Sequence, residues 1–360
     1  MKCLRPIGVA LGCTMLASGA MAQLSITPPA QTPPAKKEAP KPKVHSPVAK
    51  KPTPKPAASA TPKPAASPTP SPTPTQAVDD PNVDLVYGAY QRGMYKTAFD
   101  LATVRAQNNN DAKAMTMLGE LYANGLGVKR DYAKAAEWYK RAADSGDREA
   151  MFALAMLRMS GRGGPVDKGE AVKLMASAAK LGEPKAAYNL ALLYLDGQTL
   201  PQDVKRSAEL LRQAADAGLP EAQYALATFY KEGTGVPKDP ERAVRLLQAA
   251  SLADNVDAEV EYAIAMFNGT GTPKNQPAAV ALLRKASRQG SAIAQNRLAH
   301  VLATGVGAPV DKVEALKWHT VAKTAGKGDP DLDDILADMS PEDRAKGEAA
   351  ARKWIGNNVK

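Results

Sequence analysis

Residues 111–146 read DAKAMTMLGELYANGLGVKRDYAKAAEWYKRAADSG, and this pattern returns every 36 residues, without insertion or deletion, as far as residue 326. The apolar position of Leu118, for example, returns as Leu154, Leu190, Leu226, Tyr262 and Leu298. A fixed period of this length is typical of a solenoid, in which each unit buries its apolar face only by stacking on its neighbours. The sequence therefore predicts six stacked copies of one unit.

Each copy has the pattern of two helices joined by a loop. In the first half, apolar or small residues recur at i, i+4, i+5 and i+8, which places them on one face of a helix. Gly125 follows this stretch and can adopt the left-handed conformation of a helix C-cap. The second half begins behind Asp131, a residue type that accepts a hydrogen bond from the first turn of a helix, and it ends at Gly146. We therefore predict an all-α solenoid of six 36-residue helix-turn-helix repeats.

Two details concern the ends of the second helices. Asp167 with Glu170, and Asp311 with Glu314, have the spacing of a capping box, in which the two side chains exchange hydrogen bonds with each other's backbone N–H groups. Asp254 stands at a position where the other repeats end their second helix with glycine.

The repeat resembles a known family. The run Ala114-x3-Leu118-Gly119-x2-Tyr122-x2-Gly125-x-Gly127, continued by Asp131-x2-Lys134-Ala135-Ala136-x-Trp138-Tyr139, is similar to the consensus of the Sel-one-like repeat, a relative of the tetratricopeptide repeat. Arg158 departs from it by replacing a tyrosine, and Thr199 by replacing the second loop glycine. The resemblance covers residues 84–354. It implies a right-handed α/α superhelix that acts as a protein-interaction scaffold, often in exported bacterial proteins of envelope or signalling complexes.

The two ends of the repeat region depart from the pattern, as the capping units of solenoids do. Residues 84–109 have the pattern of a degenerate opening helix pair. Residues 327–360 predict a short helix that starts at Asp329-Pro330 and a last helix that starts behind Ser340. We therefore place N-terminal capping helices at 79–110, the repeats at 111–326 and C-terminal capping helices at 327–360.

Residues 1–22 have the pattern of a secretory signal peptide. Lys2 and Arg5 form a charged start, an apolar stretch follows, and Ala20-Met21-Ala22 supplies a small-x-small cleavage site. We therefore predict cleavage after Ala22 and an exported protein, periplasmic or secreted. No later segment reaches 18 apolar residues, so the sequence predicts no transmembrane span.

Both cysteines, Cys3 and Cys13, lie inside this leader. Cys13 follows Ala-Leu-Gly, which partly matches the cleavage box of a bacterial lipoprotein, so the sequence leaves lipidation of Cys13 open. If cleavage follows Ala22 instead, the mature chain has no cysteine for a disulfide, a thiol nucleophile or a metal site.

Residues 23–78 hold sixteen of the 29 prolines and eight lysines, with Glu38 as the acidic residue and no glycine or aromatic residue. Such a composition cannot bury enough apolar surface to offset the entropy of ordering, so we predict a disordered Pro/Lys-rich tether with a polyproline II bias. It can act as a spacer alone, or it can also contact an anionic envelope surface.

The formal net charge of +10 belongs mostly to these two segments. The leader carries +2 and the tether +7, which leaves +1 for residues 79–360. Nucleic-acid binding requires a basic surface on the folded region. We therefore predict no nucleic-acid partner.

The sequence shows no motif with the spacing of a catalytic or metal site. His45, His300 and His319 show none of the spacings of a metal motif such as His-x3-His, and no Gly-x-Ser-x-Gly elbow occurs, although a Ser-His-Asp triad stays open. The Gly-x-Gly loops follow a helix and recur with the repeat, so structural turns explain them better than phosphate binding. We predict no catalytic residue, metal or cofactor.

The candidate binding positions come from the tetratricopeptide relative, where first-helix positions between the core ones line the concave groove. By analogy they lie two, six and nine residues after Ala114 and its equivalents, on one helical stripe. The candidate partner-binding residues are Phe152, Met156, Met159, Tyr188, Leu192, Leu195, Tyr224, Val260, Ile264 and Phe267. Two alternatives stay open, because these side chains either line a groove or belong to the core.

The sequence thus favours an exported, non-catalytic scaffold or adaptor that binds a protein or peptide partner through the concave face of the solenoid, in envelope-associated processes. One alternative is an enzyme that acts on cell-wall material, with a pocket built across several repeats. The other is an envelope-anchoring protein whose basic tail makes the main contact. The sequence predicts neither a particular partner nor an oligomeric state.

Overall fold

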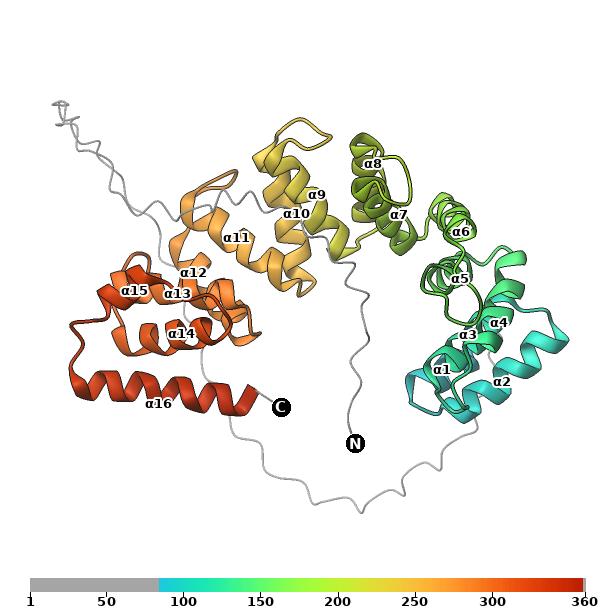
Figure 1. The fold of residues 1–360 in the computed structure, drawn as a ribbon, viewed down its shortest axis with the longest axis horizontal. Coiled ribbons are helices and arrows are strands. Elements are labelled where there is room, and N and C mark those ends of the chain that lie inside the picture. Colours follow the sequence, from blue (N-terminus) through green and yellow to red (C-terminus); the bar gives the residue numbers. More distant parts are fainter. Residues whose placement is uncertain (1–83, 359–360) are drawn as a thin grey trace, which may run out of the picture. The chain divides into compact units, whose positions relative to one another are not determined.

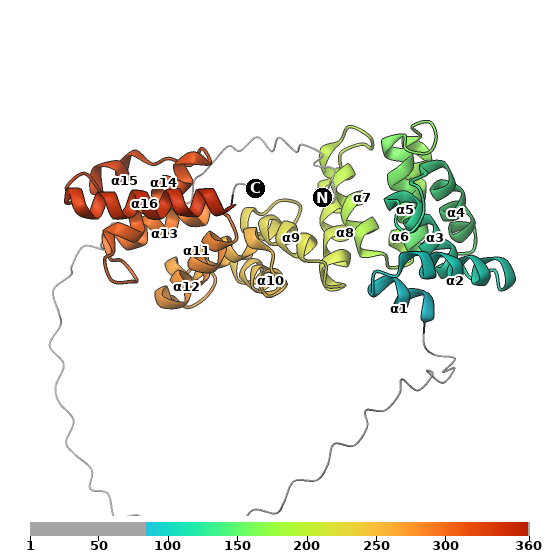
Figure 2. The same ribbon diagram turned by 90° about the horizontal axis from the view of Figure 1, so that it is seen from below.

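The structure is a computed structural model that describes residues 84–358. These residues form sixteen α-helices and no β-strand, so the prediction of an all-α repeat solenoid is confirmed (Figures 1 and 2). The predicted signal peptide (1–22), the cleavage site after Ala22, Cys13 and the tether (23–78) lie outside the described residues.

Each repeat contributes two helices of 13 residues. The first helices are α3 (Ala112–Asn124), α5 (Arg148–Ser160), α7 (Pro184–Asp196), α9 (Pro220–Glu232), α11 (Val256–Asn268) and α13 (Ala292–Thr304). The second helices are α4 (Tyr132–Asp144), α6 (Lys168–Lys180), α8 (Val204–Asp216), α10 (Pro240–Leu252), α12 (Gln276–Arg288) and α14 (Lys312–Thr324). Every first helix contacts its own second helix, and every second helix contacts the next first helix (Figure 1).

Four further helices flank the repeats. The opening pair is α1 (Leu85–Gln91) and α2 (Tyr95–Asn108), and the closing helices are α15 (Pro330–Ile335) and α16 (Pro341–Asn358). Helix α16 lies along α14, where the Trp318 and Trp354 rings meet edge to face with centroids 5.0 Å apart (Figures 1 and 2). An aromatic pair of this geometry adds stability beyond its buried area. The predicted capping helices are therefore present, and α16 extends past Trp354 to Asn358.

The helix ends form as the sequence predicts. Gly125 closes the first helix of repeat one in the left-handed conformation, with φ of 68°. Asp131 precedes the second helix, and its side chain accepts a hydrogen bond of 3.0 Å from the backbone N–H of Lys134. Asp254 adopts a φ of 58° where the equivalent positions have glycine. Asp tolerates this conformation better than most residues, so the turn is kept without glycine.

The capping-box prediction is wrong in its second half. The carboxylate of Asp167 does accept a hydrogen bond of 2.8 Å from the backbone N–H of Glu170. The backbone N–H of Asp167, however, donates to the carbonyl oxygen of Arg158, and the Glu170 carboxylate accepts from the Arg158 guanidinium. Asp311 and Glu314 repeat this arrangement with α13 and α12. In both repeats the backbone N–H is thus bonded to the first helix, and the glutamate is bonded to an arginine, Arg158 of α5 or Arg284 of α12.

In the loops of repeats one, two, four and five, the second glycine lies against the backbone at the start of a helix of the preceding unit. A Cβ at Gly163 would lie 2.1 Å from the carbonyl oxygen of Tyr132, the first residue of α4, in the preceding repeat. A Cβ at Gly271 would lie 2.3 Å from the carbonyl oxygen of Pro240, the first residue of α10. Both glycines also have positive φ, 74° and 69°. Only glycine allows two backbones to approach this closely in this conformation.

The departures from the repeat pattern have local structural reasons. Arg158, in place of a tyrosine, reaches Glu170 with its Nε 2.9 Å from the carboxylate. The loop residue Gly164 leaves room for it, because a Cβ there would lie 2.9 Å from the guanidinium. Thr199 does not adopt a positive φ, so the loop of repeat three follows a different path from the others.

We predict that Gly271→Ala destabilises the solenoid more than Gly218→Ala. Both positions have positive φ, which costs an alanine about 1–2 kcal/mol. At Gly218 nothing lies within 4 Å of an added Cβ, whereas at Gly271 the Cβ overlaps the start of α10 and adds roughly 1–3 kcal/mol. Thermal unfolding followed by circular dichroism measures both. Equal losses would show that the loop contact does not hold the repeats together.

Candidate functional site

The structure separates the ten candidate residues into two groups. Val260 and Phe267 are core residues, 3% and 5% exposed, and the partner-binding prediction does not extend to them. The loop of the next repeat covers Phe267, whose ring lies 3.1 Å from where a Cβ of Gly307 would stand. The other eight are half-buried: Phe152, Met156, Met159, Tyr188, Leu192, Leu195, Tyr224 and Ile264.

Seven of these eight follow one another on α5, α7 and α9, and we call them the first-helix strip: Phe152, Met156, Met159, Tyr188, Leu192, Leu195 and Tyr224. Phe152, Tyr188, Leu195 and Tyr224 pack against the core of repeats three and four. Met156 and Met159 pack against a smaller cluster that contains Met175 and Leu193. Side chains of the strip thus rest on the core with one side and remain partly open to solvent with the other.

Contacts in repeats four and six show which elements the same helix positions face there. Lys231, nine residues after the reference alanine of repeat four, pairs with Glu261 of α11 at 3.0 Å. Asn296 and His300, two and six residues after the reference alanine of repeat six, contact Asp329 at the start of α15 at 3.2 and 2.6 Å. The stripe position of Lys231 therefore faces the next first helix, and those of Asn296 and His300 face the start of α15, which follows the last repeat.

Carboxylates surround the repeat-four end of the strip. Burial raises the pKa of the Tyr224 phenol to about 12, and the negative charges of Glu261, Asp257 and Glu232 act in the same direction. Sequence reasoning missed these three acids, because it examined stripe positions within one helix, whereas the acids come from the end of α9 and the start of α11. Their residue types alone gave no signal.

The two histidines of the repeats form His–Asp pairs without a nucleophile. His300 Nε2 lies 2.6 Å from Asp329, and His319 Nε2 lies 2.8 Å from Asp333. In a catalytic triad the other ring nitrogen contacts the nucleophile. Here both Nδ1 atoms are buried without a hydrogen-bond partner. These pairs attach α15 to the last repeat, and neither completes a Ser-His-Asp triad within residues 84–358.

Glu259 is a carboxylate with no exposed surface, and buried acids are candidates for acid–base chemistry. Its Oε1 pairs with the Lys285 ammonium, and its Oε2 has no partner. The equivalent residues Gln223 and Gln295 each donate a hydrogen bond to the carbonyl oxygen eight residues earlier, at 3.3 and 3.1 Å. The position therefore belongs to the junction between repeats, and Glu259 is a structural residue of that junction.

We predict that Glu259→Gln melts at the same temperature as the parent chain or higher. The amide can donate to the carbonyl of Ser251, as Gln223 and Gln295 do in their repeats, and the substitution removes a buried charge. Glu259→Ala leaves the junction without either bond and lowers the stability by about 1–3 kcal/mol. Thermal melting of the two variants compares them. If Glu259→Gln lowered the melting temperature as much as Glu259→Ala, the ion pair with Lys285 would be the interaction that stabilises the junction.

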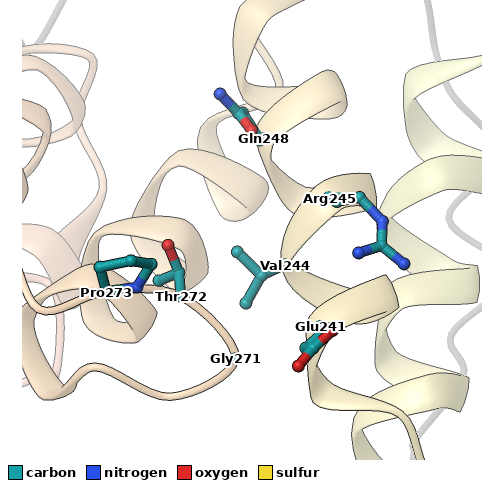
Figure 3. A pocket seen from close by; sticks show the side chains of 7 residues that line it. All are labelled: Glu241, Val244, Arg245, Gln248, Gly271, Thr272 and Pro273. Carbon is teal, nitrogen blue, oxygen red and sulfur yellow. The ribbon is translucent and has the colours of Figure 1, made fainter.

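A cavity of about 460 Å³ lies away from the strip, between α10 and the loop of repeat five. It is lined by Glu241, Val244, Arg245, Gln248, Gly271, Thr272 and Pro273. Figure 3 shows Glu241 and Arg245 projecting from α10, with the loop residues Thr272 and Pro273 across from them. One carboxylate, one guanidinium and one amide do not form a nucleophile–base pair. Gly271, which lies against the start of α10, forms part of its wall.

Two further features bear on the chemistry of the described region. Within residues 84–358, no three or more His, Cys, Asp or Glu side chains gather in a way that could hold a metal ion. None of the helices described there combines the length and the apolar character that crossing a membrane requires.

Helix pairs that stack in an unbroken 36-residue register define an α/α solenoid repeat protein. The model described as Sel1 repeat matches residues 112–147, 148–183, 184–219, 220–255, 256–291 and 292–327, which is more than half of the 360-residue chain. The chain belongs to the Sel1 repeat family, as the resemblance of the sequence predicted.

Solved structures agree with this assignment. The chain is similar to a Sel1 repeat protein from Oxalobacter formigenes, with 28% identity and a TM-score of 0.60, over 68% of this chain and all of that one. It is also similar in fold to c5321, a protective antigen of uropathogenic Escherichia coli strains with an SLR fold. That likeness has 24% identity and a TM-score of 0.51, over 73% of this chain and 64% of that one. No curated protein matches the chain.

Proposed function

We propose that this protein is an exported, non-catalytic scaffold that binds an apolar segment of a partner protein through the first-helix strip. The observation that carries the proposal is the run of seven half-buried apolar side chains on three consecutive first helices. Covering their open sides with a partner removes apolar surface from water, which contributes about 25 cal/mol per Å². The methionines of the strip add side chains that adapt to different partner shapes.

Stacking of the repeats does not require apolar residues at these positions. The stripe of repeat one carries Thr116 and Glu120, and that of repeat six carries Asn296 and His300, yet both repeats stack like the others. Stacking alone therefore does not require that the half-buried positions of repeats two and three be apolar on the side that is open to solvent. Binding of a protein segment explains the apolar side chains there, and extended helical-repeat surfaces are suited to it.

The non-catalytic part of the proposal is supported by the groups that an enzyme would use. The imidazoles of His300 and His319 each bond an aspartate and offer no partner to a nucleophile. Glu259 pairs with Lys285 at a junction where repeats four and six have glutamine. Export to the periplasm or beyond rests on the residue pattern of the leader (1–22), and a role in envelope complexes rests on the family resemblance.

We predict that Met156→Glu and Leu192→Glu each abolish partner capture while leaving the melting temperature nearly unchanged. A charge on the strip must be desolvated when the partner binds, which costs several kcal/mol without a counter-charge. The full-length chain serves as bait in the native envelope fraction, and mass spectrometry quantifies the proteins retained by each variant.

Leu252→Glu is the matched control, because Leu252 is an 81% exposed leucine on the second helix α10. It should retain the same proteins as the parent chain. Loss of capture in all three variants, or in none, contradicts the assignment of binding to the strip. A loss of helicity in Met156→Glu or Leu192→Glu would place these residues in the core.

A further inference from the structure

Repeats four and five separate their charges between the two helix layers. The first helices α9 and α11 carry five carboxylates against one lysine: Glu221, Glu232, Asp257, Glu259, Glu261 and Lys231. The second helices α10 and α12 carry five cations against one carboxylate: Arg242, Arg245, Arg284, Lys285, Arg288 and Glu241. The net charge of the folded region does not show this division, because the negative charge of the first layer and the positive charge of the second nearly cancel.

The excess of carboxylates lies next to the end of the first-helix strip. Glu232, Asp257 and Glu261 all raise the pKa of Tyr224, the last residue of the strip, so their charges act at its phenol. Lys231 pairs with Glu261 at 3.0 Å and offsets one of the three. Glu232 and Asp257 are exposed, so two carboxylates remain in excess at the surface beside Tyr224.

The other part of the strip has no such excess. Helices α5 and α7, which carry six of its seven apolar residues, hold three cations and two carboxylates: Arg148, Arg158, Lys185, Glu149 and Asp196. The surface of the first helices thus changes from apolar in repeats two and three to acidic at the junction of repeats four and five. A partner that matches this surface must change its own character in the same order.

We propose that the partner segment is apolar along one half and rich in lysine or arginine along the other. The apolar half covers the strip on α5 and α7, and the basic half faces Glu232, Asp257 and Glu261. This inference rests on the proposed function, because it assigns a chemistry to the partner of the same strip. Charge complementarity at such an edge mainly raises the association rate and selects among partners, and salt weakens it.

The experiment uses the full-length chain and three labelled synthetic peptides, with binding followed by fluorescence anisotropy. The first peptide joins a block of leucine, phenylalanine and methionine to a block of lysines. The second replaces the lysines by glutamates, and the third keeps the lysines but replaces the apolar block by serine and glycine. At about 20 mM salt we expect the first peptide to bind at least about tenfold more tightly than either of the others. At about 0.5 M salt the difference between lysine and glutamate peptides should shrink several-fold.

A triple variant tests the acidic end directly. The variant combines Glu232→Gln, Asp257→Asn and Glu261→Gln. At low salt it should bind the apolar-lysine peptide about tenfold more weakly than the parent chain does, and it should bind the apolar-glutamate peptide no more weakly. The matched control neutralises three exposed acids of second helices, Glu137→Gln, Asp216→Asn and Glu241→Gln, which changes the net charge by the same amount. It should bind the apolar-lysine peptide like the parent chain. Melting curves of both triple variants confirm that they fold.

The outcomes separate the inference from the proposed function. Equal affinity for the lysine and glutamate peptides, or an unchanged affinity of the acidic-end variant, overturns the inference. If Leu192→Glu still weakens the binding of every apolar peptide in that case, the proposed function stands. An unchanged affinity in Leu192→Glu overturns both. The serine-glycine-lysine peptide could also bind more tightly than the apolar-lysine peptide. That result would show that the surface binds basic segments in general, such as the lysine-rich residues 36–63 of another copy, and it would also overturn the inference.

Discussion

The closest contact between neighbouring repeats joins two backbones: the second glycine of a loop and the first residue of the preceding second helix. Gly163 on Tyr132 and Gly271 on Pro240 approach within distances that exclude any side chain. Where a loop carries this glycine, its backbone packs directly on the repeat before it, which fixes the distance between the two repeats. The loop of repeat three has Thr199 at this position and lacks the contact. Where the contact forms, the distance between first helices on this surface is therefore set by loop glycines that are not part of the surface. A change in a surface side chain leaves this spacing intact.

Much of the fold could be predicted because its signals are local. Asp131 and Gly125 bracket a loop within seven residues, and both act in the structure as their residue types predict. The reciprocal half of the capping box failed because its partners are not local. The backbone N–H of Asp167 bonds a carbonyl of α5, and Glu170 bonds the guanidinium of Arg158. A four-residue motif cannot show that a neighbouring helix already satisfies its donor and acceptor.

The sequence predicted which helix face the candidate residues share, but it predicted only partly which of them are exposed to solvent. Periodicity places Leu192 and Phe267 on the same stripe, but Phe267 is covered by the loop that contains Gly307, and Leu192 stays half-buried. Exposure depends on the adjacent repeat, which the period of one helix does not report. The acidic end of the strip was missed for the same reason, because Glu232 and Asp257 come from different repeats. The near-zero net charge of the folded region also concealed it.

Stacking and surface chemistry are thus carried by different residues. Glycines, caps and small residues such as Gly119, which admits the ring of Tyr139, fix the geometry and recur in the repeats. The stripe positions vary more: they are apolar in repeats two, three and five and include polar side chains in repeats one, four and six. In repeat two, Arg158 replaces the tyrosine that repeats one, three and four have at this position, and Gly164 leaves space for its guanidinium. A solenoid built in this way can vary its binding surface one repeat at a time, because each substitution is felt mainly by the repeats on either side.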